Sequence, residues 1–332
     1  MRTPGDSDDV IVVGGGVIGL TTAVVLAEAA NGRRVTVWSR DPAAETTSAV
    51  AGGLWWPYRV EPVDEAGGWA LRALRALSRL AERPRETGVR MAEGVRAGVA
   101  LEELGSWSAE VPGLRPARAG ELPPGVAHGL RARVPLVDMG VHLRYLRRRL
   151  EAAGGSVVVR AVDSLETAAE HAPLVVNCTG LGARELVPDP EVYPVQGQLV
   201  IVENPGVEEW FVAADGAAAE TVYALPQPYG LVLGGTAREG VWETAPDPAV
   251  AEAIVARCAR IHPALATARV VGHRVGLRPC RSRVRLEAEE LPGGRRCVHN
   301  YGHGGAGLTV AWGCAREAAR LARDATRRGD GG

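Results

Sequence analysis

Apolar residues along the chain fall into short β-branched runs and longer stretches with helical spacing. Near the start, the run Val10–Val13 ends at a glycine, and the apolar positions of Ile18–Ala29 fit one broad helical face. The pair Asn31-Gly32 ends this segment, and a second apolar run follows at Arg34–Trp38. A strand, a helix and a strand in this order predict a βαβ unit at the start of the chain.

The rest of the chain carries the same two kinds of pattern. Residues 66–104 are rich in Ala, Leu and Arg and predict helices, whereas residues 105–135 are interrupted by Pro and Gly and predict short strands. Further helices are predicted at Val141–Ala153, Ala249–Ile261 and Leu308–Ala325. Further strands are predicted at Val157–Val162, Leu174–Asn177, Leu199–Val202, Thr221–Leu225, Leu231–Gly235, Val270–Val284 and Arg296–His299.

This order of elements predicts an α/β (α+β) fold. A Rossmann-type nucleotide-binding domain is assembled from both ends of the chain, and a second, largely antiparallel sheet is inserted between them. The length of 332 residues also suggests about two domains.

Composition narrows the class of protein. The chain is 46% hydrophobic with a formal net charge of −1, which favours a globular fold and gives no reason to expect nucleic acid or an anionic membrane as a partner. No apolar run approaches the roughly 20 residues of a membrane-spanning helix, and the polar N-terminus lacks the apolar core of a signal peptide. Five scattered cysteines without a CxxC are typical of reduced thiols, so we expect a cytoplasmic protein.

The chain contains no lysine, so all 38 basic residues are arginine. This bias makes a solvated surface charge the default interpretation of any single arginine. An arginine is therefore considered functional only where a motif supports it.

Three glycines after the first strand form a dinucleotide fingerprint. Gly14, Gly16 and Gly19 stand at the positions that make the turn, admit a pyrophosphate and let helix and strand pack. Arg40 and Asp41 follow the second strand, where an acid normally binds the ribose and an arginine accepts a 2′-phosphate, so NADP is an alternative. The segment TTSAVAGGLWWPY, residues 46–58, places many backbone donors together and favours a flavin bound along its length.

Three later motifs carry further candidate chemistry. NCTG ends a strand at Thr179, where small residues allow a cofactor to lie close to the backbone. In GLRPCR, Arg278 is flanked by Leu277 and Pro279, which suits a guanidinium that clamps a carboxylate. HNYGHGGAGLTVAWG, from His299, has too few ligands for a metal, but a glycine turn before a helix suits an anion or a polar carbonyl.

Together these motifs, in this order along essentially the whole chain, resemble the D-amino acid oxidase / D-aspartate oxidase family. The resemblance implies non-covalent FAD and oxidative deamination of a D-amino acid, with hydride leaving the substrate α-carbon for flavin N5. The products are a 2-oxo acid, ammonia and the hydrogen peroxide formed from O2. It also implies an FAD-binding domain of residues 1–60, 135–197 and 270–332, and a substrate-binding domain of residues 61–134 and 198–269.

The resemblance also assigns roles to particular residues. Arg278 and Tyr223 are expected to bind the substrate carboxylate, the backbone carbonyl of Gly305 its amine, and Trp56 its side chain. No acid or base side chain is expected to act in catalysis, and His303 is expected to pack or hydrogen-bond within its turn. The expected cofactor contacts are Gly14, Gly16, Val17, Ile18, Gly19, Arg40, Asp41, Thr47, Ser48, Gly53, Leu54, Val162, Thr179, Arg278, Gly304, Gly305, Gly307, Leu308 and Thr309.

Departures from the family pattern bear on specificity. The segment Phe211–Thr221 is short, and Ala219 stands where vertebrate members carry a second tyrosine, so we expect a small or absent lid. With Trp55, Trp56 and Val212 in the wall, neutral or apolar D-amino acids are favoured over D-aspartate. The alternatives are a glycine- or sarcosine-type amine oxidase, a D-aspartate oxidase, an NAD(P)-dependent dehydrogenase and a flavin-bound protein without activity. Whether the protein forms a homodimer is left open.

Overall fold

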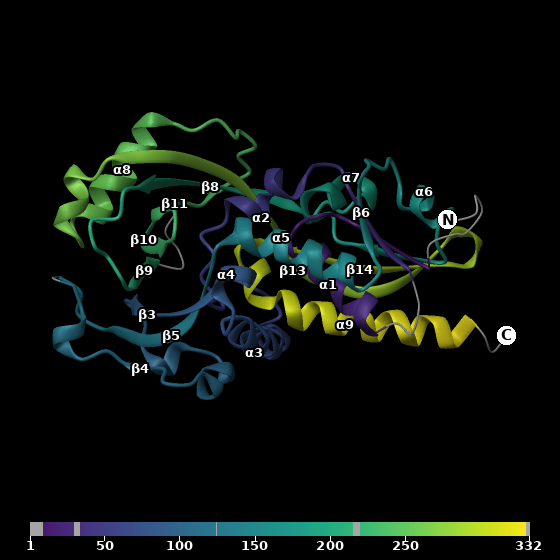
Figure 1. Ribbon diagram of the computed structural model, residues 1–332, viewed down its shortest axis with the longest axis horizontal. Helices are drawn as coiled ribbons and strands as arrows, with labels where there is room; N and C mark the ends of the chain where they lie inside the picture. The colour runs from purple at the N-terminus through teal and green to yellow at the C-terminus, as the bar shows by residue number, and fades with distance from the viewer. Residues whose placement is uncertain (1–8, 30–33, 124, 215–219, 330–332) are drawn as a thin grey trace.

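The computed structural model describes residues 9–29, 34–123, 125–214 and 220–329, and Figure 1 shows their arrangement. The strands are β1 (Val10–Val13), β2 (Val35–Ser39), β3 (Val89–Ala97), β4 (Arg115–Pro116), β5 (Gly129–Val137), β6 (Ser156–Val159), β7 (Leu174–Asn177), β8 (Tyr193–Val202), β9 (Trp210–Ala214), β10 (Glu220–Gln227), β11 (Gly230–Thr236), β12 (Arg238–Glu239), β13 (Val270–Leu291) and β14 (Arg295–His303). The helices are α1 (Val17–Ala29), α2 (Thr47–Val50), α3 (Val63–Leu80), α4 (Pro84–Thr87), α5 (Met139–Ala152), α6 (Leu165–Ala169), α7 (Ala183–Leu186), α8 (Pro248–Ala259) and α9 (Gly307–Gly329).

Parallel strands from the start, the middle and the end of the chain form the first half of the structure. They lie in the order β14-β7-β1-β2-β6, and each neighbouring pair is parallel. The side chains of β1 alternate between two cores: Val10 and Val12 belong to the core that also contains residues of α1, α5 and α9, whereas Ile11 and Val13 pack with residues of α6. A parallel sheet covered on both faces is the arrangement that the fingerprint glycines require.

The second half is a mixed sheet in the order β4-β5-β3-β9-β10-β11-β8. Its neighbours are antiparallel except β3 and β9, which run parallel. Helix α8 covers one face, where Ile254 packs with Val200 and Leu231, and Figure 1 shows it on the outer side of this sheet. The opposite face turns toward the Trp-rich segment around Trp56.

Strand β13 belongs to both halves. Its first part pairs with β8, and its last part pairs with β14, so that Cys280 has Tyr193 as its partner on one side and His303 on the other. Residues near position 280 therefore lie where the two halves meet.

The structure confirms the predicted α/β fold and corrects one element. The chain is not helical throughout residues 66–104, because Val89–Ala97 forms strand β3. This segment hydrogen-bonds β5 on one side and β9 on the other, and those partners are distant in sequence, so local composition did not reveal them. Ala219 lies outside the described residues, and the domain boundaries stay a prediction. No helix among the described residues is long and apolar enough to cross a membrane.

Helices α3 and α9 approach each other closely at one glycine. A Cβ placed on Gly313 in α9 would lie 2.3 Å from the Cα and the carbonyl oxygen of Trp69 in α3. A second helical glycine, Gly68, has open space where its Cβ would stand. The two positions separate the effect of close packing from that of helix propensity.

We expect Gly313→Ala to destabilise the protein by about 1–3 kcal/mol, since the added methyl group must push α3 and α9 apart. The matched change Gly68→Ala should be neutral or stabilising by roughly 0.5–1 kcal/mol, because alanine is the better helix former. Urea unfolding of both variants measures the difference. Equal destabilisation by the two changes would contradict the close-packing argument.

Candidate active site

The turn between β1 and α1 admits no side chains at its glycines. Gly14 has φ +119°, and a Cβ on it would lie 2.3 Å from the carbonyl oxygen of Cys178 at the end of β7. A Cβ on Gly19 would lie 1.8 Å from the carbonyl oxygen of Gly14. The bare backbone of this turn leads into the first turn of α1, whose amide groups have no acceptor within the helix and favour an anion.

Helix α2 supports this turn from the opposite side. The hydroxyl of Ser48 accepts a hydrogen bond from the amide of Val17 at 2.9 Å. The hydroxyl of Thr47 donates to the carbonyl of Leu277 in β13 at 3.1 Å. These two contacts fix α2 between the start of α1 and the strand that carries Arg278.

Residues predicted near the adenosine end lie at the carboxyl ends of neighbouring parallel strands. Arg40 and Asp41 follow β2 and form an exposed ion pair with each other at 2.9 Å. The amide and hydroxyl of Thr179 after β7 both donate to the side-chain oxygen of Asn177. Val162, beyond β6, packs beside the cluster that contains Ile11 and Val13. The parallel sheet therefore brings all three positions to one edge.

Arg278 occupies a bare patch of the sheet. A Cβ on Gly197, in the adjacent strand β8, would lie 2.4–2.6 Å from the Arg278 guanidinium, which therefore lies directly over that glycine. Its Nη1 donates to the carbonyl oxygen of Thr236 at 3.0 Å. The side chain also passes Gly305, where a Cβ would stand 3.5 Å from the Arg278 Cδ.

Tyr223 lies on the same face of the sheet as Arg278. Its ring covers Gly234, where a Cβ would lie 1.6 Å from the ring. Gly234 pairs with Leu199, which is two residues from Gly197 and so shares its face. Burial raises the pKa of Tyr223 and the Arg278 charge partly opposes this, so the phenol stays protonated near neutral pH and can donate a hydrogen bond.

The segment before α9 closes the site. Gly304 has φ +53°, and Gly304–Ala306 forms a single short turn that leads into the helix. A Cβ on Gly307 would lie 3.9 Å from both Val17 and Ile18, so the start of α9 and the start of α1 are neighbours. The two glycine-rich segments, far apart in sequence, thus lie side by side.

Thr309 and the Trp56 segment bond reciprocally. The Thr309 hydroxyl accepts from the Trp56 amide at 3.3 Å and donates to the Trp56 carbonyl at 3.1 Å. Nearby, Gly53 has φ +85° and its carbonyl accepts from the amide of Val137, while Leu54 bridges to Leu136. The structure therefore assigns the Thr309 side chain to holding the Trp56 segment.

Aromatic rings form the wall beside this segment. Trp56 has its ring centroid 5.7 Å from that of Trp107 and 6.0 Å from that of Trp210. Trp55 is fully buried and donates to the carbonyl of Ala70. The Trp56 ring is therefore packed between two other indole rings, and Val212 packs against the same core.

His303 is a neutral, buried side chain. Only 3% of it is exposed, and burial lowers its pKa to about 3. Among the described residues no group of three His, Cys, Asp or Glu side chains could hold a metal ion.

Comparison with known proteins agrees with this geometry. Residues 9–321 match the DAO family, described as FAD dependent oxidoreductase. The chain belongs to this family. It is 64% identical over 95% of its length to the D-amino-acid oxidase of Streptomyces coelicolor, of which 96% is covered. It is 50% identical over 94% of its length to the D-amino-acid oxidase of Rubrobacter xylanophilus, of which 95% is covered.

Solved structures of this fold extend the comparison. Glycine oxidase from Geobacillus kaustophilus matches with a TM-score of 0.79 at 20% identity, over 95% of this chain and 94% of that chain. At this identity the likeness concerns the fold alone. The predicted family, fold and FAD cofactor are confirmed.

The residues at the junction fit FAD. Side chains are excluded at Gly14 and Gly19, so a diphosphate can approach the backbone there, at the N-terminus of α1, whose dipole favours an anion. Gly304–Thr309 borders the same space from the other side and places the N-terminus of α9 where a cofactor ring carrying negative charge would be stabilised.

Sequence reasoning missed the residues that position Arg278 and Thr179. Gly197 and the carbonyl of Thr236 seat the guanidinium, and the one available signal was a glycine within a strand, which often marks a close approach. Asn177 bridges Thr179 to His299, whose Nδ1 lies 3.2 Å from the Asn177 amide. This network depends on β7 and β14 being neighbours, and their partnership has no local signal.

We expect Thr309→Val to reduce the free energy of unfolding by about 1–3 kcal/mol, because it leaves the buried amide and carbonyl of Trp56 without their partner. Thr309→Ser keeps the hydroxyl and should retain most of the stability. Denaturant unfolding of the FAD-loaded protein measures both. A similar loss in the serine variant would mean that the methyl group, not the hydroxyl, matters.

The buried histidines make stability depend on pH. The folded-state pKa of His303, about 3, lies below the ordinary value of 6.5, so the stabilisation is complete above pH 6.5 and is lost as pH falls from there toward 3. We expect His303→Gln to reduce the slope of unfolding free energy against pH, between pH 6 and 4.5, by up to about 1.4 kcal/mol per unit. His142, whose pKa burial lowers to about 4, should behave likewise when changed to Gln. An unchanged slope in both variants would exclude buried neutral imidazoles as the cause.

Proposed function

We propose that this protein catalyses the FAD-dependent oxidative deamination of D-amino acids to 2-oxo acids, ammonia and hydrogen peroxide, with O2 as the acceptor. The observation that carries the proposal is the seating of Arg278: over Gly197, bonded to the Thr236 carbonyl and in contact with Gly305. One Nη1 bond leaves the other N–H groups of the guanidinium for a ligand. A planar guanidinium in a half-buried position suits a substrate carboxylate.

Three contacts would orient the substrate. Arg278 and the protonated Tyr223 phenol bind its carboxylate from the same face of the sheet, and the carbonyl of Gly305 accepts from its amine. The Trp56 ring limits the space for the third substituent, the substrate side chain. When three substituents of the α-carbon are held, only one enantiomer directs its hydrogen at the cofactor.

The remaining chemistry needs no side-chain acid or base. When bound, FAD supplies the two-electron acceptor. The protein binds the amine through a backbone carbonyl and orients the α-carbon. The buried His303 is neutral and is assigned no proton transfer.

We also propose a preference for neutral or apolar D-amino acids, supported by the Trp56 and Val212 wall. One charged residue lies in the same row of the sheet: Arg96 in β3 pairs with Val212, which pairs with Tyr223. Its Nη1 donates to the carbonyl of Ala97 at 2.7 Å, and burial lowers its pKa. A peroxide assay over D-alanine, D-valine, glycine, sarcosine and D-aspartate tests the preference. If D-aspartate were best, the apolar assignment would be wrong and Arg96 would become the candidate for its side-chain carboxylate.

We also propose that the chain has the two predicted domains and that the protein is cytoplasmic. The domain division is supported by the way β13 passes from the antiparallel to the parallel part. The location is supported by five free thiols, each without a disulfide partner.

Removing the guanidinium should abolish most of the activity without loss of the cofactor. We expect Arg278→Gln to lower kcat/KM for D-alanine by about a hundredfold or more, since losing one partner of such a pair costs roughly 2–5 kcal/mol. Gly197→Ala keeps the guanidinium but places a methyl group beneath it and should cause a comparable loss. Arg269→Gln, which removes an exposed partner of Glu203 at the start of β13, is the matched control and should stay within twofold.

Flavin absorbance of each purified variant shows whether FAD is still bound. The carboxylate role of Arg278 would be overturned if Arg278→Gln, still yellow, retained wild-type kcat/KM. If no variant or wild-type protein produced peroxide from any D-amino acid, the proposed function itself would be wrong.

A further inference from the structure

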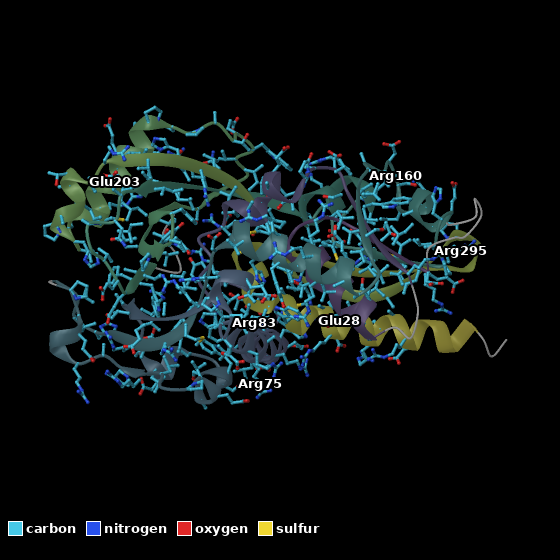
Figure 2. The ribbon with its side chains drawn as sticks, viewed as in Figure 1. Glu28, Arg75, Arg83, Arg160, Glu203 and Arg295 are labelled. Atoms are coloured by element: carbon cyan, nitrogen blue, oxygen red, sulfur yellow. The ribbon has the colours of Figure 1, made fainter. Side chains whose placement is uncertain are left out.

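A groove outside the FAD and substrate site has five arginines among its twelve lining residues. It has a volume of about 680 Å³ and is formed by the ends of α3 and α5, by α4 and by the middle of α9. Its charged lining is Arg79, Arg83, Arg148, Arg149, Arg316, Glu82 and Glu86, and Figure 2 labels Arg83 on this side of the molecule. None of the residues assigned above to FAD or to substrate lines it.

The groove carries excess positive charge. Arg83 pairs with Glu86 at 3.1 Å, and Arg149 binds Glu28 through two nitrogens, at 2.6 and 2.9 Å. In the described part of the chain no carboxylate lies within ion-pair distance of Arg79, Arg148 or Arg316. Within the described residues, the one hydrogen bond of the Arg148 side chain goes to the backbone carbonyl of Glu86, at 3.3 Å. Three guanidinium groups around one hollow therefore form no ion pair with the described carboxylates, and the lining holds one further acid, Glu82, beside the paired Glu86.

The floor of the groove is aromatic and buried. Tyr145 and Trp312 are 6% and 4% exposed, and the guanidinium of Arg149 lies 5.0 Å from the centre of the Trp312 ring. The indole Nε1 of Trp312 is buried and has no hydrogen-bond partner among the described residues. An unsatisfied buried donor costs free energy, and this one belongs to a residue that lines the groove.

The lining chemistry selects one class of ligand. Guanidinium groups match the geometry of phosphate oxygens, and several of them around one hollow favour an anion with more than one negative charge. The volume falls in the range of pockets that bind small molecules of nucleotide size. Two of these arginines also have a role that needs no ligand. Arg79 and Arg149 stand in the last turns of α3 and α5, where a positive charge stabilises the helix dipole. That role does not account for Arg316, which lies within α9.

We propose that this groove is a second binding site, for an anion that carries two or more phosphate groups. The anion is held by Arg79, Arg148 and Arg316 above the floor of Tyr145 and Trp312. Inorganic triphosphate and a nucleoside triphosphate share this chemistry, and a base would add contact with the apolar floor.

The test is isothermal titration calorimetry of the FAD-loaded protein with inorganic triphosphate and, separately, with ATP. We expect saturable binding of both with dissociation constants below 1 mM, weakening severalfold when salt rises from about 0.05 to 0.3 M. The double variant Arg79→Gln/Arg316→Gln should weaken binding at least tenfold. Tighter binding of ATP than of triphosphate would place the base on the aromatic floor, and equal binding would assign the whole affinity to the phosphates.

The matched control is Arg75→Gln/Arg320→Gln, which removes two charges from the same helices outside the groove. Neither residue lines the groove: Arg75 pairs with Glu110 at 2.5 Å, and Arg320 pairs with Glu317 and Asp324. Its affinity should stay within twofold of the wild type. If both double variants lost the same affinity, the anion would be responding to net charge alone and the proposed site would be wrong. Absent or non-saturable binding to the wild-type protein would also contradict the proposal.

Flavin absorbance during the titration distinguishes this groove from the substrate site. An anion bound at Arg278 should perturb the flavin spectrum, whereas one bound in the groove should leave it unchanged. Binding that perturbs the flavin and survives Arg79→Gln/Arg316→Gln would assign the anion to the substrate site and contradict the proposal. This outcome is independent of whether D-amino acids are oxidised.

Discussion

Strand β13 is the constraint on which the rest of the structure depends. Its backbone groups hydrogen-bond β8 in one half of the molecule and β14 in the other, so a single extended segment sets how the two sheets meet. Around Arg278 the pairing with β8 is regular, from Gly276 with Gly197 to Cys280 with Tyr193, so that the ladder sets the place from which Arg278 projects at the junction. The same junction brings Gly305, which follows β14, to the side of the Arg278 side chain.

Close approach of backbone to side chain recurs throughout the site. Gly197 makes room for the Arg278 guanidinium, Gly234 for the Tyr223 ring and Gly14 for the end of β7. In each case the missing Cβ permits a contact that no other residue would allow. Rigid seats of this kind hold a binding group in one orientation, which matters because a small error in the position of the substrate α-carbon lowers the rate steeply.

Arginine serves distinct purposes in a chain without lysine. Arg40, Arg75 and Arg320 form exposed pairs with neighbouring carboxylates, and pairs of this kind contribute little to stability. The Arg278 guanidinium lies over Gly197 and donates a hydrogen bond to the carbonyl of Thr236. The arginines around Trp312 form a third group, gathered by four helices into a groove with too few carboxylates to neutralise it. These arginines have the same side chain, and their different roles follow from the surroundings that tertiary packing gives each of them.

The sequence by itself determined the βαβ unit at Val10–Ser39, the glycine turn and the FAD family, because local periodicity and fixed spacings of glycine are sufficient signals for these. It also marked Arg278 as a candidate, from its neighbours Leu277 and Pro279. Tertiary structure alone decided that Val89–Ala97 is a strand, that Thr309 holds the Trp56 backbone and that Arg278 lies over Gly197. The physical reason is the same in each case: these contacts join residues far apart in sequence. Their free energy arises only after the sheets and helices have brought the partners together.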